Sequence, residues 1–220
     1  MRKFLAGTVV SLGLMSVPLS AFALVINIDT YLNGSLVGDD VTLGTLTLIQ
    51  NGSNVDFNFF NSVGNLGLIG DDAFISKLFF SYDGDPALTK SSFINFGGAQ
   101  TVTAGDFKIN PGKDSGYDFF LALNYPTRSA NRFINGEFTT WTISGVSVDD
   151  FTVSVSGSGP AALAMVHIQQ VGEGKGGEGS LKYVGSGDDG PPPQELPEPA
   201  TLALLGLGLL GIGVTRRYKK

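Results

Sequence analysis

VTLGTLTLIQNGSNVDFNFF, residues 41–60, contains two stretches of strand character on either side of a turn. Residues 41–49 are rich in β-branched side chains, which pack well on a pleated surface. Residues 55–59 alternate apolar with polar side chains, which is the period of a β-strand. Between them, residues 51–54 (Asn-Gly-Ser-Asn) accept the backbone angles of a tight turn. The stretch therefore predicts a β-hairpin.

The rest of residues 24–184 has the same character. Short stretches of strand composition occur at residues 73–82, 117–125, 139–144, 151–156, 161–171 and 181–184. Clusters of Gly, Asn, Asp and Pro separate them, as at residues 83–86 and 110–112. No segment combines helical spacing of apolar residues with helix caps. We predict one all-β domain over residues 24–184, an antiparallel β-sandwich of jelly-roll-like or immunoglobulin-like outline.

The first 23 residues have the layout of a secretory signal peptide. Two cations precede an apolar run at residues 4–17, and a proline follows the run. Ala21 and Ala23 provide the small side chains that signal peptidase recognises before its cleavage site. We expect signal peptidase to cleave after Ala23, so that the exported chain begins at Leu24.

The exported part is strongly acidic and lacks cysteine. Residues 24–196 contain eight Lys and Arg against nineteen Asp and Glu. Such a body is repelled by nucleic acid and by anionic lipid, so nucleic acid is not an expected partner. The absence of cysteine excludes disulfides and thiolate chemistry. Stability must therefore come from a core or from bound ions.

The C-terminal part reads as a linker followed by a membrane-directed segment. Residues 185–196 are rich in Gly and Pro, which favours an extended, solvated linker. Residues 200–214 are an apolar run that, as a single hydrophobic helix, spans about 22 Å of a hydrocarbon core about 30 Å thick. Arg216 and Arg217 follow the run and place the C-terminus in the cytoplasm.

Pro197-Glu198-Pro199, the apolar run and Arg216-Arg217, in this order, resemble the PEP-CTERM sorting signal of Gram-negative bacteria. The resemblance covers the last 24 residues and makes residues 197–220 a sorting signal. It implies recognition by exosortase, an inner-membrane protease, while residues 200–215 hold the chain transiently in the inner membrane. It also implies a destination at the cell surface or outside the cell, because such proteins accompany exopolysaccharide and biofilm production. An ordinary single-pass anchor is the alternative.

Few residues point to catalysis. His167 is the only histidine of the chain, so a zinc site or a nucleophilic triad would rest on it alone. We interpret it as a partly buried or interface residue. Carboxylates for glycoside hydrolysis would have to come from residues such as Asp118 and Glu137, and nothing in the sequence shows that any two of them face each other at a useful separation. We assign no catalytic residue and predict that the chain is not an enzyme.

Aspartates occur in clusters at predicted turns, at residues 39–40, 71–72, 83–85 and 149–150. Turns bring together carboxylate and carbonyl oxygens, which are the ligands that calcium prefers. Asp83 and Asp85 are our first choice for a calcium site, because a single turn can offer both carboxylates to one ion. The alternative is that these aspartates are solvated turn residues. No other cofactor is expected.

Three classes of function are open. The first is a structural or adhesive protein of the cell surface or extracellular matrix. The second is a calcium-assisted carbohydrate-binding module. Exposed aromatic side chains, such as Trp141 or Tyr125, would favour this class, because sugar rings stack on aromatic faces. The third is an envelope glycosidase, which requires two carboxylates that face each other across a cleft.

Overall fold

The computed structural model describes residues 23–35, 40–70, 72–172 and 177–187. These residues belong to one compact unit, Ala21–Gln194. Within the described ranges the chain forms β-strands and short 3₁₀ helices and no α-helix. The prediction of an all-β domain is therefore confirmed. The hydrophobic helix predicted at residues 200–214 lies outside the described residues.

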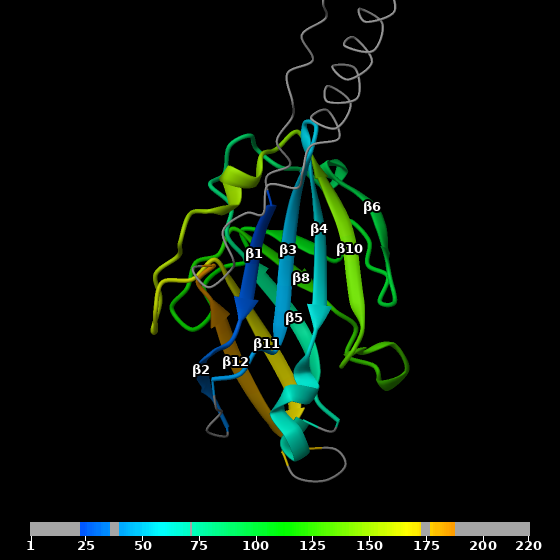
Figure 1. The fold of residues 1–220 in the computed structure, drawn as a ribbon, viewed down its shortest axis with the longest axis vertical. Helices are drawn as coiled ribbons and strands as arrows, with labels where there is room; N and C mark the ends of the chain where they lie inside the picture. Colours follow the sequence, from blue (N-terminus) through cyan, green and yellow to red (C-terminus); the bar gives the residue numbers. More distant parts are fainter. Residues whose placement is uncertain (1–22, 36–39, 71, 173–176, 188–220) are drawn as a thin grey trace, which may run out of the picture. The chain divides into compact units, whose positions relative to one another are not determined.

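The strands form two sheets in which every pair is antiparallel, and Figure 1 shows one sheet in front of the other. Sheet A has the order β1-β3-β4-β10-β6, and sheet B has the order β2-β12-β11-β5-β8-β7 with β9 beside β5. The strands of sheet A are β1 (Ala23–Ile28), β3 (Gly44–Asn51), β4 (Asn54–Asn61), β6 (Phe93–Gly98) and β10 (Phe138–Ser144). The strands of sheet B are β2 (Thr30–Gly34), β5 (Phe74–Phe80), β7 (Phe107–Ile109), β8 (Leu121–Asn124), β9 (Phe133–Ile134), β11 (Ala164–Val171) and β12 (Gly179–Gly185). The 3₁₀ helices are η1 (Val63–Gly70), η2 (Lys90–Ser92), η3 (Ser129–Asn131) and η4 (Val148–Phe151).

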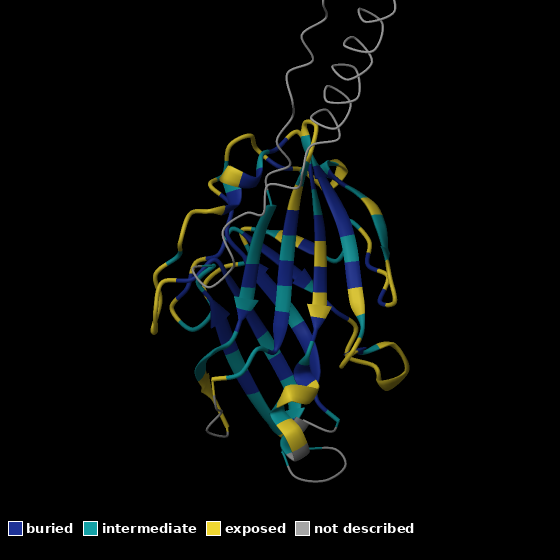
Figure 2. Ribbon diagram, viewed as in Figure 1, coloured by how far each residue is buried: buried dark blue, intermediate teal, exposed yellow. Residues whose placement is uncertain are grey.

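The main core lies between the inner faces of the two sheets. Phe57 of β4 stacks on Trp141 of β10 with 5.0 Å between ring centroids. Phe80 of β5, in the other sheet, lies 5.8 Å from the Phe57 ring and 5.9 Å from the Trp141 ring. Aromatic side chains bury large apolar areas, so these contacts hold the sheets together without a disulfide. Figure 2 shows the resulting alternation of buried and exposed residues along the strands.

A second, smaller apolar cluster covers part of the outer face of sheet B. Phe79 of β5 packs against Phe119, with 6.2 Å between ring centroids, and Phe119 stacks on Tyr117. The Tyr117 hydroxyl donates a hydrogen bond to the Pro160 carbonyl at 2.6 Å. The segments before β8 and before β11 are therefore fixed on this face, where they position charged residues described below.

The hairpin predicted from residues 41–60 is confirmed. Strands β3 and β4 pair in unbroken register from Gly44 opposite Asn61 to Asn51 opposite Asn54. Gly52, in the two-residue connection, has a φ of +60°, in the left-handed region that glycine reaches without steric cost.

Two strand predictions differ from the structure. The strand predicted at residues 151–156 is wrong, because a capping box of Ser147 and Asp150 begins η4 and directs Phe151 into the core. The segment that follows makes one isolated bridge, between Val155 and Ala162. The strand predicted at residues 117–125 is shortened to β8, since its first residues supply the rings of the outer cluster.

Candidate binding site on the outer face of sheet B

One row of polar side chains crosses the outer face of sheet B. Lys77 of β5 lies opposite Asn124 of β8 on one side and opposite His167 of β11 on the other. His167 lies opposite Lys182 of β12, and Lys182 lies opposite Asn33 of β2. Directly opposed residues of neighbouring strands project to the same face, with Cβ atoms about 4.5–5.5 Å apart. We call these five residues the cross-strand row.

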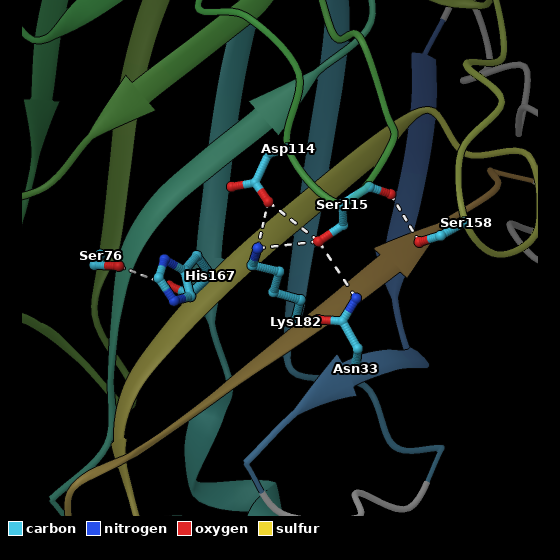
Figure 3. Close-up of polar contacts among 7 residues, drawn as sticks. All are labelled: Asn33, Ser76, Asp114, Ser115, Ser158, His167 and Lys182. Atoms are coloured by element: carbon cyan, nitrogen blue, oxygen red, sulfur yellow. Dashed lines mark hydrogen bonds and ion pairs between the residues drawn. The ribbon is translucent and has the colours of Figure 1, made fainter.

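A loop crosses above Lys182 and holds it in place (Figure 3). Its Nζ forms an ion pair with Asp114 Oδ1 and donates a hydrogen bond to Ser115 Oγ at 3.0 Å. Ser115 Oγ donates to Asp114 Oδ1 at 3.1 Å and accepts from Asn33 Nδ2 at 3.3 Å. Ser158 Oγ fixes the loop by donating to the Ser115 carbonyl at 2.7 Å. The charge of Lys182 is therefore compensated within the fold.

His167 lies between two cations. Burial is the largest cause that lowers the pKa of His167, and the charges of Lys182 and Lys77 lower it further against the opposing charge of Asp114. The imidazole is therefore neutral at neutral pH. For Asp114, burial acts to raise the pKa, but the hydrogen bond and charge of Lys182, with the hydrogen bond of Ser115, lower it overall. The Asp114 carboxylate is therefore ionised.

A hollow of about 410 Å³ adjoins the cross-strand row. Its apolar floor is formed by Phe79 and Ala122, which lie opposite each other on β5 and β8. Amines and amides surround this floor, and such groups bind anions and hydroxyl-bearing ligands without chemistry at the ligand. We call this cavity the lysine hollow; its polar lining includes Lys77, Lys108, Asn110, Lys113, Asp114 and Asn124.

The aspartates predicted to bind calcium lie in the turn after β5. Asp83 Oδ1 accepts a hydrogen bond from the Asp85 amide at 2.9 Å, and the Asp83 amide donates to the Asp150 carbonyl at 2.8 Å. Burial, as the largest cause, and the charges of these three aspartates raise the pKa of Tyr82. Within the described ranges, no group of three or more His, Cys, Asp or Glu side chains is placed to hold a metal ion. Calcium binding by Asp83 and Asp85 stays a prediction.

The aromatic residues named as candidates for sugar stacking are buried. Trp141 is 1% exposed and Tyr125 is 4% exposed, so neither offers a stacking surface. Phe60 and Phe138 instead lie opposite each other on the outer face of sheet A and are 43% and 42% exposed. The burial of Trp141 could have been predicted from the sequence. In a strand of period two, Trp141 projects to the same face as the apolar Ile143, which is the face expected to be buried.

The cross-strand row has no comparable signal in the sequence. Its five residues come from five strands and are separated by long stretches of chain. Sequence reasoning therefore found His167 as an isolated residue and missed its two lysine neighbours. Lys182 alternates with the apolar Leu181 and Tyr183, whereas Lys77 follows Ser76 in a largely apolar strand. The pattern within one strand does not indicate which strand lies beside it.

The residues predicted to direct export lie at or beyond the borders of the described ranges. Ala23 and Leu24 begin β1, where Leu24 pairs with Leu48, and Ala21 lies outside the described residues. Pro197, Glu198, Pro199, Arg216 and Arg217 also lie outside them. Among the described residues, no helix is long and apolar enough to cross a membrane.

Comparison with known proteins gives one match. No curated protein and no solved structure matches the chain. The family model of the PEP-CTERM protein-sorting motif matches residues 195–217, which include the Pro-Glu-Pro sequence and the two arginines. The chain therefore carries a PEP-CTERM protein-sorting motif, which indicates export to the cell surface with exosortase as the processing partner.

Proposed function

We propose that the exported chain is a non-catalytic structural or adhesive protein of the cell surface or extracellular matrix, associated with exopolysaccharide and biofilm. The observation that carries the proposal is the sorting motif at residues 195–217, which follows a compact β-sandwich in the same chain. The motif supplies a route to the cell surface. The sandwich supplies two broad outer faces and an aromatic core that needs no disulfide.

The outer face of sheet A supports an adhesive role. Thr47, Asn58 and Thr140 lie in register across β3, β4 and β10, so their hydroxyl and amide groups face solvent in one row. The exposed pair of Phe60 and Phe138 lies on the same face. Hydroxyls and amides can exchange hydrogen bonds with a polysaccharide, and aromatic rings can cover the apolar face of a sugar.

Binding of the purified exported protein to a polysaccharide array tests this function. We expect binding to at least one exopolysaccharide, weakened when Phe60→Ala and Phe138→Ala are combined. Val153→Ala is the matched control, because Val153 is 51% exposed and lies outside the strands. Failure to bind any polysaccharide, or equal binding by the Phe60 and Phe138 double variant, contradicts an adhesive role of this face.

A calcium-assisted carbohydrate-binding module is the second candidate. The observation that favours it is that the charges of Asp83, Asp85 and Asp150 all act on Tyr82, so that carboxylate oxygens, which calcium prefers as ligands, lie on this side of the fold. We expect calcium to raise the thermal unfolding temperature and a chelator to lower it. The variant Asp83→Asn should lose this response, whereas Asp118→Asn, at an exposed aspartate elsewhere, should keep it. An unfolding temperature that is independent of calcium removes this candidate.

A further inference from the structure

The outer face of sheet B gathers most of the positive charge that the described residues contain. These residues include seven Lys and Arg, and four of them, Lys77, Lys108, Lys113 and Lys182, lie in the cross-strand row or the lysine hollow. They come from separate parts of the chain, namely β5, β7, the loop before β8, and β12. In a protein whose body is acidic, this face is therefore a local exception.

Most of this charge has no partner in the fold. Lys182 pairs with Asp114, but among the described residues no carboxylate lies within ion-pair distance of the amines of Lys77, Lys108 or Lys113. The Lys77 amine lies 5.9 Å from the centroid of the Phe79 ring. Three uncompensated cations thus surround one concave surface.

The three unpaired cations gain no ion pair from the described part of the fold. Like charges that face each other on neighbouring strands repel, and in the row His167 stands between Lys77 and Lys182. The fold avoids a third adjacent charge because His167 is neutral at neutral pH. Clustered cations that do not stabilise the fold are typical of a surface that binds an anion.

The shape of the surface narrows the class of anion. Adjacent strands lie about 4.8 Å apart, so the backbones of Lys77 and Lys182, two strands apart, are separated by roughly 10 Å. The charges are spread over several strands, which suits an anion repeated along a polymer. Amide side chains of Asn33, Asn110 and Asn124 lie among the cations and can bind hydroxyl groups.

We propose that the lysine hollow and the cross-strand row bind the carboxylates of an acidic polysaccharide, a polymer that contains uronate sugars. The lysine amines pair with the carboxylates, and the amides of the asparagines bind sugar hydroxyls. A nucleic acid duplex, with one charge per about 1.7 Å, is repelled by the remaining acidic body more strongly than a polymer that carries at most one charge per sugar. That the polymer is a polysaccharide rests on the function proposed above, whereas the anion site rests on the charges alone.

The single histidine provides a direct measurement of this site. The full chain, purified in a non-ionic detergent without a histidine tag and labelled at the histidine Cε1, should show one NMR signal, from His167. Polygalacturonate should bind with an affinity that falls as salt rises, and binding should raise the pKa of His167 because it brings negative charge beside the ring. The fully methyl-esterified polymer has the same backbone without the charge and should produce neither effect.

Variants separate binding from folding. Combining Lys77→Gln with Lys113→Gln should weaken polygalacturonate binding about tenfold or more, since two unpaired amines are lost. Arg128→Gln removes one exposed charge outside the lysine hollow and should leave the affinity within about twofold. The unfolding temperature of the lysine variants should stay close to that of the original chain, because neither amine forms an ion pair with a described residue.

The outcomes distinguish this inference from the proposed function. Equal binding of the ester and the acid, or phosphate binding as tight as polymer binding, overturns the assignment to a uronate polymer. Binding of neutral polysaccharides alone, with no shift at His167, overturns this inference and leaves the adhesive function standing. Absence of binding to every polysaccharide overturns both.

Discussion

At the scale of single residues, the lowered pKa of His167 makes a prediction about stability. Between this lowered value and the ordinary value of 6.5, the unfolded chain binds more protons than the folded protein. The free energy of unfolding should therefore fall as the pH is lowered through this window and then level off below the folded pKa. The effect should be modest because the ring is partly exposed to solvent.

Urea unfolding midpoints measured across this window provide the check. His167→Gln should flatten the dependence on pH, since glutamine does not titrate. Asp114 affects stability in a lower range of pH, because its pKa lies below the ordinary value of 3.8. Its contribution to the free energy of unfolding is therefore lost only as the pH falls below that value. An unchanged slope in the His167→Gln variant would contradict the role given to this residue.

At the scale of elements, the glycines that close turns and bulges are not equivalent. Gly98, at the end of β6, has a φ of +103°, and a Cβ there would lie 2.4 Å from the Phe138 carbonyl oxygen of β10. Gly52, in the β3–β4 turn, has a φ of +60° with open space around it. We expect Gly52→Ala to cost about 1 kcal/mol in unfolding free energy, for the backbone alone. Gly98→Ala should cost clearly more, because it also separates β6 from β10.

The comparison is measured by denaturant unfolding of both variants beside the original chain. Equal losses of unfolding free energy in the two variants would mean that β6 and β10 can move apart without destabilising the fold. That result would contradict the close approach at Gly98.

The same scale shows what the sequence can and cannot predict. The hairpin of β3 and β4 was predictable because its alternation, its turn and its pairing all lie within twenty residues. Residues 152–156 also alternate, but they lie beyond a capped 3₁₀ helix, and side-chain alternation does not reveal that no partner strand is beside them. The cross-strand row depends on long-range register between five strands, which a single sequence does not encode locally.

At the scale of the whole molecule, the sorting motif should direct processing and then be dispensable. Changing Arg216 and Arg217 to Glu should misplace the tail in the membrane, because the cations that define its cytoplasmic end are lost. Changing Pro197 and Pro199 to Ala should leave insertion intact but slow cleavage, since prolines keep the backbone extended for a protease.

The mass of the protein released from cells with and without exosortase measures this outcome. We expect the released protein to lack the tail in cells that have exosortase and to keep it in cells that do not. Accumulation of full-length chain, ending at Lys220, in the outer layer would show that the tail is a permanent anchor.

The position of β12 in sheet B has a consequence for the timing of translocation. This strand lies between β2 and β11, although β2 is near the start of the described chain and β12 is at its end. In a chain that crosses a membrane from its N-terminus, β2 emerges early. The edge of β2 that pairs with β12 then stays unpaired until residues 179–185 emerge. Pairings of such sequence separation form slowly. In such a chain sheet B therefore stays incomplete until β12 has crossed, and β12 crosses shortly before the sorting motif at residues 195–217 reaches the membrane.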